Sequence, residues 1–172
     1  MPEKHAKHGP SGLKYKNPST GGCSHWRNDP HSDTTAADAG TLQHDWMEEW
    51  GKFILGLTPK DPGTVLTEEQ LTNTAFCQRV VEPYLRQADK AGLEEKLTIV
   101  DTKGGTITWG TSDVVLRTGN RLTLIDYKFG RSHIDAPADN MQAKAYTAGA
   151  FQKNPEVETA EFMFIVPRRD EV

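Results

Sequence analysis

The chain contains 172 residues, about the length of a single domain with one hydrophobic core. Apolar residues make up 35% of it and charged residues 26%, which excludes a wholly disordered or fibrous protein. The formal net charge of −4 argues against binding nucleic acid by bulk charge, and no apolar run approaches the roughly 18–20 residues of a membrane helix. Two cysteines, Cys23 and Cys77, cannot form a disulfide framework, so a reducing, cytoplasmic location is expected.

The first 32 residues differ from the rest of the chain. They hold five basic residues against two acidic ones and are rich in Gly, Pro, Ser and Asn, a composition typical of an arm or loop. Cys23-Ser24-His25 is not followed by a second ligand pair at zinc-finger spacing, so a zinc site is not favoured. We predict a basic N-terminal arm over residues 1–32, flexible or loosely docked on a domain that spans residues 33–172.

A first helix is predicted from about residue 33 to residue 57. Gly40 either kinks this helix or delays its start, and His44 lies one turn before Glu48 on one of its faces. Apolar residues recur at intervals of three and four and predict one buried stripe, made of Leu42, Trp46, Trp50, Phe53 and Leu57. The segment 58–66 contains two prolines and a glycine and is predicted as a loop.

A second helix is predicted to begin at a capping box, Thr67-Glu68-Glu69-Gln70. Its buried face is expected to contain Phe76, Val80, Tyr84 and Leu85, with Pro83 kinking or splitting the helix. Gly92 is expected to end it.

The remaining chain is rich in β-branched and aromatic residues, interrupted by one further helical segment. Strands are predicted at 97–100, 106–117, 122–129 and 161–166, and a helix at 138–153. Gly119-Asn120 is a two-residue hairpin signal between the second and third of these strands. The order predicts an α/β fold, with a small mixed β-sheet whose core is an antiparallel hairpin and which is flanked by helices.

The predicted hairpin places two carboxylates opposite each other. If Gly119-Asn120 forms the turn, Asp113 lies across from Asp126, with Cβ atoms roughly 4.5–5.5 Å apart on one face. A divalent cation between them would offset their repulsion, and Lys128 would emerge on the same face beside it. A plain surface ion pair between Asp126 and Lys128 is the alternative reading. The apolar residues around both aspartates favour the metal site.

The last predicted helix carries two more polar groups. Gln142 and Tyr146 are four residues apart, so they share one face of that helix. An amide and a phenolic hydroxyl suit contacts to a phosphate or to a water molecule.

In this order, these motifs resemble the PD-(D/E)XK nuclease superfamily, and its RecB-type branch most closely. That branch includes CRISPR-associated adaptation nucleases and phage exonuclease-like proteins, and the likeness spans roughly residues 38–166. The residues that carry it are Gly40-Thr41-Leu42-Gln43-His44, Gly110-Thr111-Ser112-Asp113, Ile125-Asp126-Tyr127-Lys128 and Gln142-Ala143-Lys144-Ala145-Tyr146. The middle acid of the superfamily is often Glu, where this chain has Asp126. The resemblance implies a restriction-endonuclease-like core, and the chain would then be a C-terminally truncated or minimal version of it.

The resemblance also implies a ligand set and a reaction. His44, Asp113, Asp126 and the backbone carbonyl of Tyr127 would bind a catalytic Mg²⁺ or Mn²⁺ ion, with Glu48 a weaker candidate. Lys128 would assist the attacking water. The remaining catalytic residues, which would position that water or the DNA, are Gln142 and Tyr146. With two cysteines, the chain cannot hold the four-cysteine iron–sulfur cluster of some members.

The leading hypothesis, which the resemblance implies, is a metal-dependent deoxyribonuclease that acts as an exonuclease in phage or bacterial DNA recombination and repair. DNA is the expected partner, and self-association into a homo-oligomer is open. The alternatives are a catalytically inactive nuclease-fold module that binds nucleic acid, and a metal-stabilised structural domain. Cleavage of DNA in the presence of metal separates the first from the second. Stabilisation by metal without any effect of DNA would identify the third.

Overall fold

The computed structural model describes residues 10, 34–63, 65–130 and 133–172. Except for residue 10, the predicted basic arm, including Cys23 and His25, lies outside the described residues. The elements in chain order are α1 (Thr34–Ile54), α2 (Glu68–Gln87), β1 (Lys90–Val100), β2 (Thr106–Thr118), β3 (Arg121–Tyr127), α3 (Met141–Lys153), β4 (Thr159–Ile165) and a short 3₁₀ turn (Pro167–Arg169). Within the described ranges, no helix is both long enough and apolar enough to cross a membrane.

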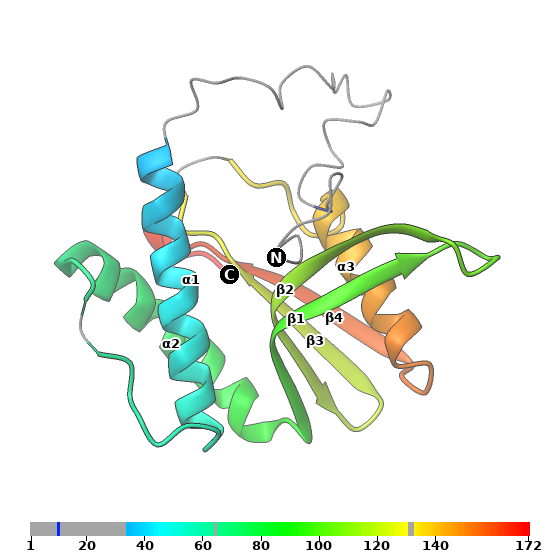
Figure 1. Ribbon diagram of the computed structural model, residues 1–172, viewed down its shortest axis with the longest axis horizontal. Coiled ribbons are helices and arrows are strands. Elements are labelled where there is room, and N and C mark those ends of the chain that lie inside the picture. Colours follow the sequence, from blue (N-terminus) through cyan, green and yellow to red (C-terminus); the bar gives the residue numbers. More distant parts are fainter. Residues whose placement is uncertain (1–9, 11–33, 64, 131–132) are drawn as a thin grey trace.

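The strands form one four-stranded mixed sheet in the order β1-β2-β3-β4. Both pairs among β1, β2 and β3 are antiparallel, whereas β4 runs parallel to β3 after a crossover through α3. Helices α1 and α2 lie on one face of the sheet and α3 lies on the other (Figure 1). This arrangement confirms the predicted α/β fold with a small mixed sheet between helices.

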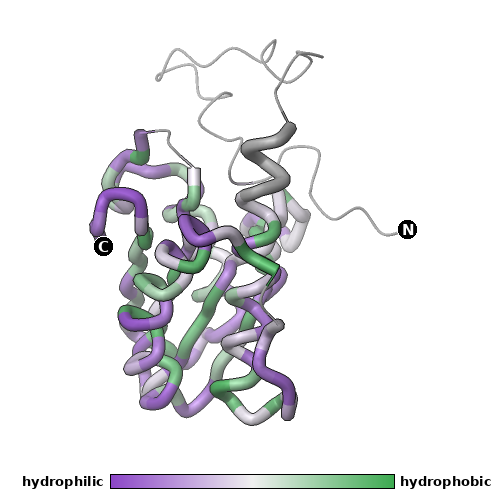
Figure 2. The backbone as a smooth tube through the Cα atoms, turned by 90° about the vertical axis from the view of Figure 1, so that its left-hand side faces the viewer, coloured by the Kyte–Doolittle hydropathy of each residue, from purple (hydrophilic) through white to green (hydrophobic). Residues whose placement is uncertain are grey.

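Each face of the sheet has its own hydrophobic core. The larger core joins α1 and α2 to the sheet through Met47, Trp50, Cys77, Val81, Leu85, Val114, Leu116, Ile125, Tyr127, Phe129, Met163 and Ile165. The smaller core joins α3 to the sheet through Leu97, Val115, Leu122, Leu124, Tyr146, Ala150 and Val157. Hydrophobic strand segments accordingly run through the middle of the molecule, while hydrophilic residues colour much of its outer turns (Figure 2).

Helix α1 runs through Gly40 without a break, and its buried face differs from the predicted stripe. Leu42, Phe53 and Leu57 are 39%, 38% and 70% exposed. Trp50 is buried as predicted and Trp46 packs against the larger core, but Gln43 and Met47 are buried where the prediction had the other three. Gln43 Oε1 accepts a hydrogen bond from Asn73 Nδ2 of α2 at 3.2 Å, which satisfies these polar groups in the interior and allows that face to turn inward.

Helix α2 has the predicted capping box. Thr67 Oγ1 accepts from the Gln70 amide at 3.4 Å, and Gln70 Oε1 accepts from the Thr67 amide at 2.9 Å. The helix is not divided at Pro83. The prediction that Gly92 ends it was wrong, because the cap is Ala88 and Gly92 already belongs to β1.

The buried face of α2 is turned by one residue relative to the prediction. It consists of Asn73, Thr74, Cys77, Val81 and Leu85. Phe76 and Val80 pack at the edge of the larger core, and Tyr84 is 38% exposed.

The β2–β3 hairpin is as predicted. Gly119 has a φ of +59°, which a two-residue turn requires and glycine adopts without strain. Thr118 pairs with Arg121, and the ladder continues to Val114 opposite Ile125. Helix α3 begins three residues later than predicted, at Met141, because the side chain of Asn140 caps it by accepting from the amides of Gln142 and Ala143.

The long β1–β2 hairpin changes face halfway along its length. Leu93 pairs with Val114 and both pack in the larger core, whereas Leu97 pairs with Gly110 on the face covered by α3. Strict alternation would put residues four apart on the same face. The alternation of side chains between the two faces therefore shifts by one residue between these two pairs, which we call the face slip. Glu94, with a φ of +47°, lies at the slip in β1. Asp113 lies at the corresponding position of β2.

Beyond the slip, the hairpin leaves the rest of the sheet. Strand β2 pairs with β3 only from Val114 to Thr118, and from Thr106 to Ser112 it pairs with β1 alone. In Figure 1 this distal half extends to the right, away from β3.

Candidate metal centre

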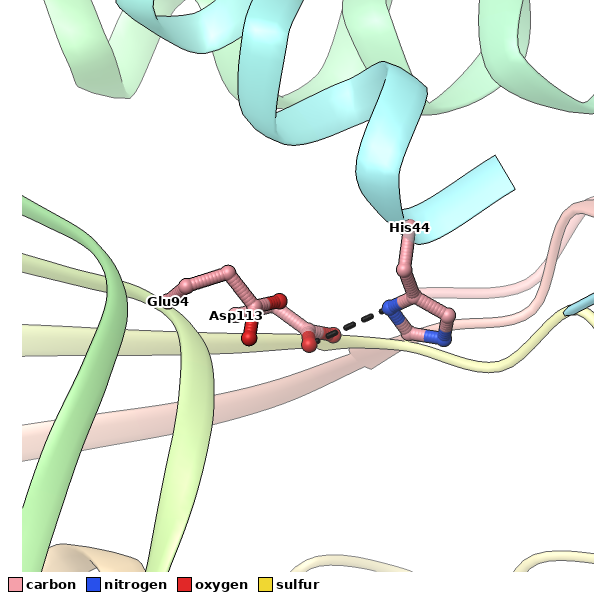
Figure 3. Close-up of side chains that lie close together, drawn as sticks. All are labelled: His44, Glu94 and Asp113. Carbon is pink, nitrogen blue, oxygen red and sulfur yellow. Dashed lines mark hydrogen bonds and ion pairs between the residues drawn. The ribbon is translucent and has the colours of Figure 1, made fainter. Parts of the chain in front are cut away.

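Three side chains from three elements meet where the β1–β2 hairpin changes face. His44 comes from α1, Glu94 from β1 and Asp113 from β2. One ligand atom from each lies within 4.8 Å of the others, and no other group of three His, Cys, Asp or Glu side chains in the described ranges does so. Figure 3 shows His44 reaching from α1 toward the two carboxylates. We call these three residues the metal group.

Asp113 is held from two directions. Its Oδ1 lies 3.1 Å from His44 Nδ1, and its Oδ2 accepts a 2.6 Å hydrogen bond from the backbone N–H of Tyr127. The β2–β3 ladder ends at the preceding pair, Val114 and Ile125. The Asp113 carboxylate therefore accepts a hydrogen bond from an N–H that would otherwise pair within the sheet. This hydrogen bond fixes the position of the carboxylate where the strands diverge.

Glu94 belongs to this group although the sequence did not indicate it. The Glu94 side chain is exposed overall, but loss of water around its carboxylate and the negative charge of Asp113 raise its pKa to about 7, against an opposing effect of His44. The sequence could not have placed it there by counting from the turn, because the register of the β1–β2 hairpin shifts between Ile99 and Val100. The sequence does not predict the left-handed backbone conformation of Glu94, because glutamate rarely adopts it.

The pKa of His44 is raised above its ordinary value. Burial lowers its pKa, but the charge and hydrogen bond of Asp113 outweigh burial, with smaller help from Asp126 and Glu94, so the pKa is raised. The ring lies edge-on to Phe129, with ring centroids 5.1 Å apart. Packing and hydrogen bonding together orient the imidazole toward the carboxylates.

Asp126, Lys128 and Gln142 form a second group next to the first. The Lys128 ammonium lies 2.6 Å from Asp126 Oδ2 and donates to Gln142 Oε1 at 3.0 Å. Gln142 Nε2 donates to Asp126 Oδ1 at 2.8 Å. All three side chains thus contact each other in a closed triangle on the α3 side of the sheet, which we call the lysine triangle.

The carboxylate of this triangle is deeply buried. Asp126 is only 3% exposed. Burial raises its pKa to about 6, the neighbouring ammonium of Lys128 opposes the shift, and Asp113 adds to it. The influence of Asp113 means that the metal group and the lysine triangle are electrostatically coupled.

The predicted facing pair of aspartates is arranged differently from the expectation. The hairpin register is as predicted, but the regular ladder stops one pair short of Asp113 and Asp126. Asp126 contacts Gln142 of α3, whereas Asp113 contacts His44 of α1 on the other side of the sheet. The face slip at Asp113 causes this difference, and it makes Glu94, in place of Asp126, the second carboxylate of the metal group.

The other predicted site residues take more peripheral positions. Tyr146 is buried on α3 beside Gly110, where an added Cβ would lie 2.9 Å from the phenolic oxygen. Burial raises its pKa, and a hydrogen bond with Gln142 opposes the shift. The backbone N–H of Tyr127 donates to Asp113. The role of the Tyr127 carbonyl as a metal ligand stays a prediction. Glu48 forms an ion pair with Lys52 at 2.9 Å and is not part of the metal group.

The chain was also compared with known proteins. No curated protein matches it. A family model described as "Protein of unknown function (DUF2800)" matches residues 5–172, which is nearly the whole sequence. The chain therefore belongs to the DUF2800 family.

Proposed function

We propose that this protein is a divalent-metal-dependent nuclease that hydrolyses phosphodiester bonds of DNA. The observation that carries the proposal is the convergence of a nitrogen and oxygen donor group with a fixed lysine. His44, Glu94 and Asp113 lie on one side of the strand junction, and the lysine triangle adjoins them. The PD-(D/E)XK resemblance supports the same reading, since residues of all its motifs gather at this junction.

The donor chemistry of the metal group fits Mg²⁺ or Mn²⁺. Carboxylate oxygens suit both ions, and an imidazole nitrogen is well tolerated by Mn²⁺. His44, Glu94 and Asp113 would hold the ion, and Asp126 is the further ligand that the resemblance implies. Such an ion would stabilise charge on the phosphate and lower the pKa of a bound water.

The lysine triangle supplies a cation with a defined direction. Gln142 orients Lys128 through its carbonyl oxygen while its amide group donates to Asp126, which fixes the orientation of the side-chain amide. Phosphodiester hydrolysis builds negative charge on phosphate oxygens, and a positioned ammonium stabilises that charge without reorganisation. Lys128 would therefore act on the phosphate or on the attacking water, with Gln142 as its positioning residue.

The test is a cleavage assay on end-labelled DNA. Single-stranded, blunt and overhanging duplex substrates are incubated with the protein and Mg²⁺, Mn²⁺ or EDTA. We expect metal-dependent cleavage that falls by about 10²-fold or more in Asp113→Asn and Lys128→Met. Asp45→Asn and Lys144→Met change exposed residues of α1 and α3 and serve as matched controls.

The substrate panel also separates the alternatives. Binding of DNA without cleavage under every metal condition would replace the nuclease with a silent nucleic-acid-binding module. Stabilisation by metal with neither binding nor cleavage would indicate a structural metal site. Exonuclease action in phage or bacterial recombination and repair is the proposed setting, and end-dependent cleavage is its specific expectation.

A further inference from the structure

We propose that the uncovered face of the distal β1–β2 hairpin binds a single-stranded segment of nucleic acid and leads it to the metal group. The inference deepens the proposed function and rests on it for the identity of the substrate. It concerns Lys96, Thr98, Ile107, Trp109 and Thr111, which we call the hairpin face.

The face slip decides which side chains form this surface. From Asp113 outward, alternation puts Thr111, Trp109 and Ile107 on the same side of β2. Lys96 pairs with Thr111, and Thr98 pairs with Trp109. The intervening residues turn the other way.

Contacts with α3 show which side chains lie on the other face of the hairpin. Glu95 forms an ion pair with Lys153 of α3 at 2.7 Å, and Leu97 packs in the smaller core. The hairpin face therefore points away from α3 and is continuous with Asp113 of the metal group.

The hairpin face is exposed and carries the groups that bind single strands. Ile107 is 62% exposed, and Lys96 and Thr98 are also exposed, while Trp109 is half-buried. The Lys96 ammonium lies 3.9 Å from the centroid of the Trp109 ring. Base stacking on an aromatic ring, next to a cation that meets the phosphate, is how proteins hold single-stranded nucleic acid without reading its sequence.

The charges of the hairpin favour an anionic ligand at this face. Glu95 is turned to α3, and the Asp101 carboxylate at the tip accepts from the amides of Lys103 and Gly105 at 2.8 and 2.9 Å. Within the described part of the chain, Lys96 has the indole ring but no carboxylate in ion-pair contact. With a net charge of −4, the protein needs such local contacts to hold a polyanion.

The distances suit a strand that runs from the hairpin into the metal group. Trp109 and Asp113 are four residues apart on one strand, which corresponds to roughly 13 Å. A segment stacked on Trp109 could therefore place a phosphate a few nucleotides away at the metal group. The hairpin face would then bind the substrate strand, and the metal group would cleave it.

The experiment measures binding without catalysis. Fluorescein-labelled single-stranded oligonucleotide is titrated with the full-length protein in EDTA and followed by anisotropy. We expect Trp109→Ala to raise the dissociation constant by about 5- to 150-fold, and Trp109→Phe, which keeps a ring, to change it by less than about threefold. Tyr84→Ala removes an exposed aromatic residue from α2 and is the matched control.

A second variant tests the cation independently of the ring. Lys96→Gln should reduce the slope of log affinity against log salt by about 0.7, the value for one phosphate contact on a single strand. Lys144→Gln should leave the slope unchanged. Thermal melts of each variant identify any that fail to fold. If Trp109→Ala fails to fold, Trp109→Phe and Lys96→Gln still test the inference.

The outcomes separate the two proposals. If the wild type cleaves DNA but Trp109→Ala and Lys96→Gln bind like the controls, the hairpin inference is overturned and the nuclease proposal stands. If the variants lose binding but the wild type never cleaves, the hairpin inference holds and the nuclease proposal fails. If the wild type binds no oligonucleotide, the hairpin inference is overturned, and the cleavage assay alone decides the nuclease proposal.

Discussion

Metal-free stability should decrease as the pH rises from 5 to 8. The pKa of Asp126 is raised to about 6 in the folded protein from its ordinary value of 3.8. Between these two values the folded state holds a proton that the unfolded chain has released, so acid favours folding. That stability is fully present below about pH 4 and is lost as the pH rises through 6.

The size of the effect follows from the linkage relation. Asp126 is almost fully buried, so solvent screening does not reduce its contribution. At pH 5 its proton stabilises the folded state by about 1.4 kcal/mol relative to pH 8. For a chain of this length, that corresponds to roughly 3–6 °C in Tm. Glu94, whose pKa is raised from 4.5 to about 7, acts in the same direction between these two values, and the raised pKa of His44 has the same sign above pH 6.5.

The assay is a set of thermal melts in EDTA at pH 5, 6, 7 and 8. Ordinary surface carboxylates also titrate at low pH, so the wild type is compared with Asp126→Asn, in which this proton is absent. The difference in Tm between the two proteins should shift by several degrees across the series, and the exposed control Asp45→Asn should follow the wild type. A parallel pH dependence of wild type and Asp126→Asn would refute the reasoning. Added Mn²⁺ should oppose the trend, because its ligands must lose their protons to bind it.

Three further predictions concern single residues. Glu94→Gln should weaken Mn²⁺ binding at least about tenfold by calorimetry, whereas Glu95→Gln, which faces α3, should not; equal affinities would remove Glu94 from the metal group. Lys128→Met should slow hydrolysis while leaving metal affinity nearly unchanged, and it should lower the metal-free Tm at pH 8, because Asp126 then loses its buried cation. An unchanged turnover would contradict the role of Lys128. Thr67→Ala should cost about 1 kcal/mol in denaturant melts through loss of the α2 cap, and a loss no larger than that of Thr72→Ala would argue against the cap.

Some parts of the fold could be predicted because they depend on neighbours in the sequence. The capping box at Thr67 and the turn at Gly119 are set by a few adjacent residues with strong local preferences. Once the turn is fixed, the β2–β3 register follows by counting. The contact between Asp126 and Lys128 follows too, since residues two apart on a strand share a face.

The inward faces of α1 and α2 could not be predicted from periodicity alone. Leu42 and Phe53 are more apolar than Gln43, yet they are exposed and Gln43 is buried. The choice depended on a contact between helices, the hydrogen bond from Asn73 to Gln43, which makes a polar face suitable for burial. Such a pairing joins residues 30 positions apart and leaves no trace in either helix considered separately.

The sequence by itself determined the α/β fold, the hairpin and the residue types available for chemistry. Only the tertiary structure decided that Asp113 turns to His44 and Glu94 while Asp126 turns to Lys128 and Gln142. The physical reason is the left-handed backbone at Glu94, which shifts the alternation of the β1–β2 hairpin by one residue. A conformation that glutamate seldom adopts is maintained by packing on both faces of the sheet, and that packing exists only in the folded protein.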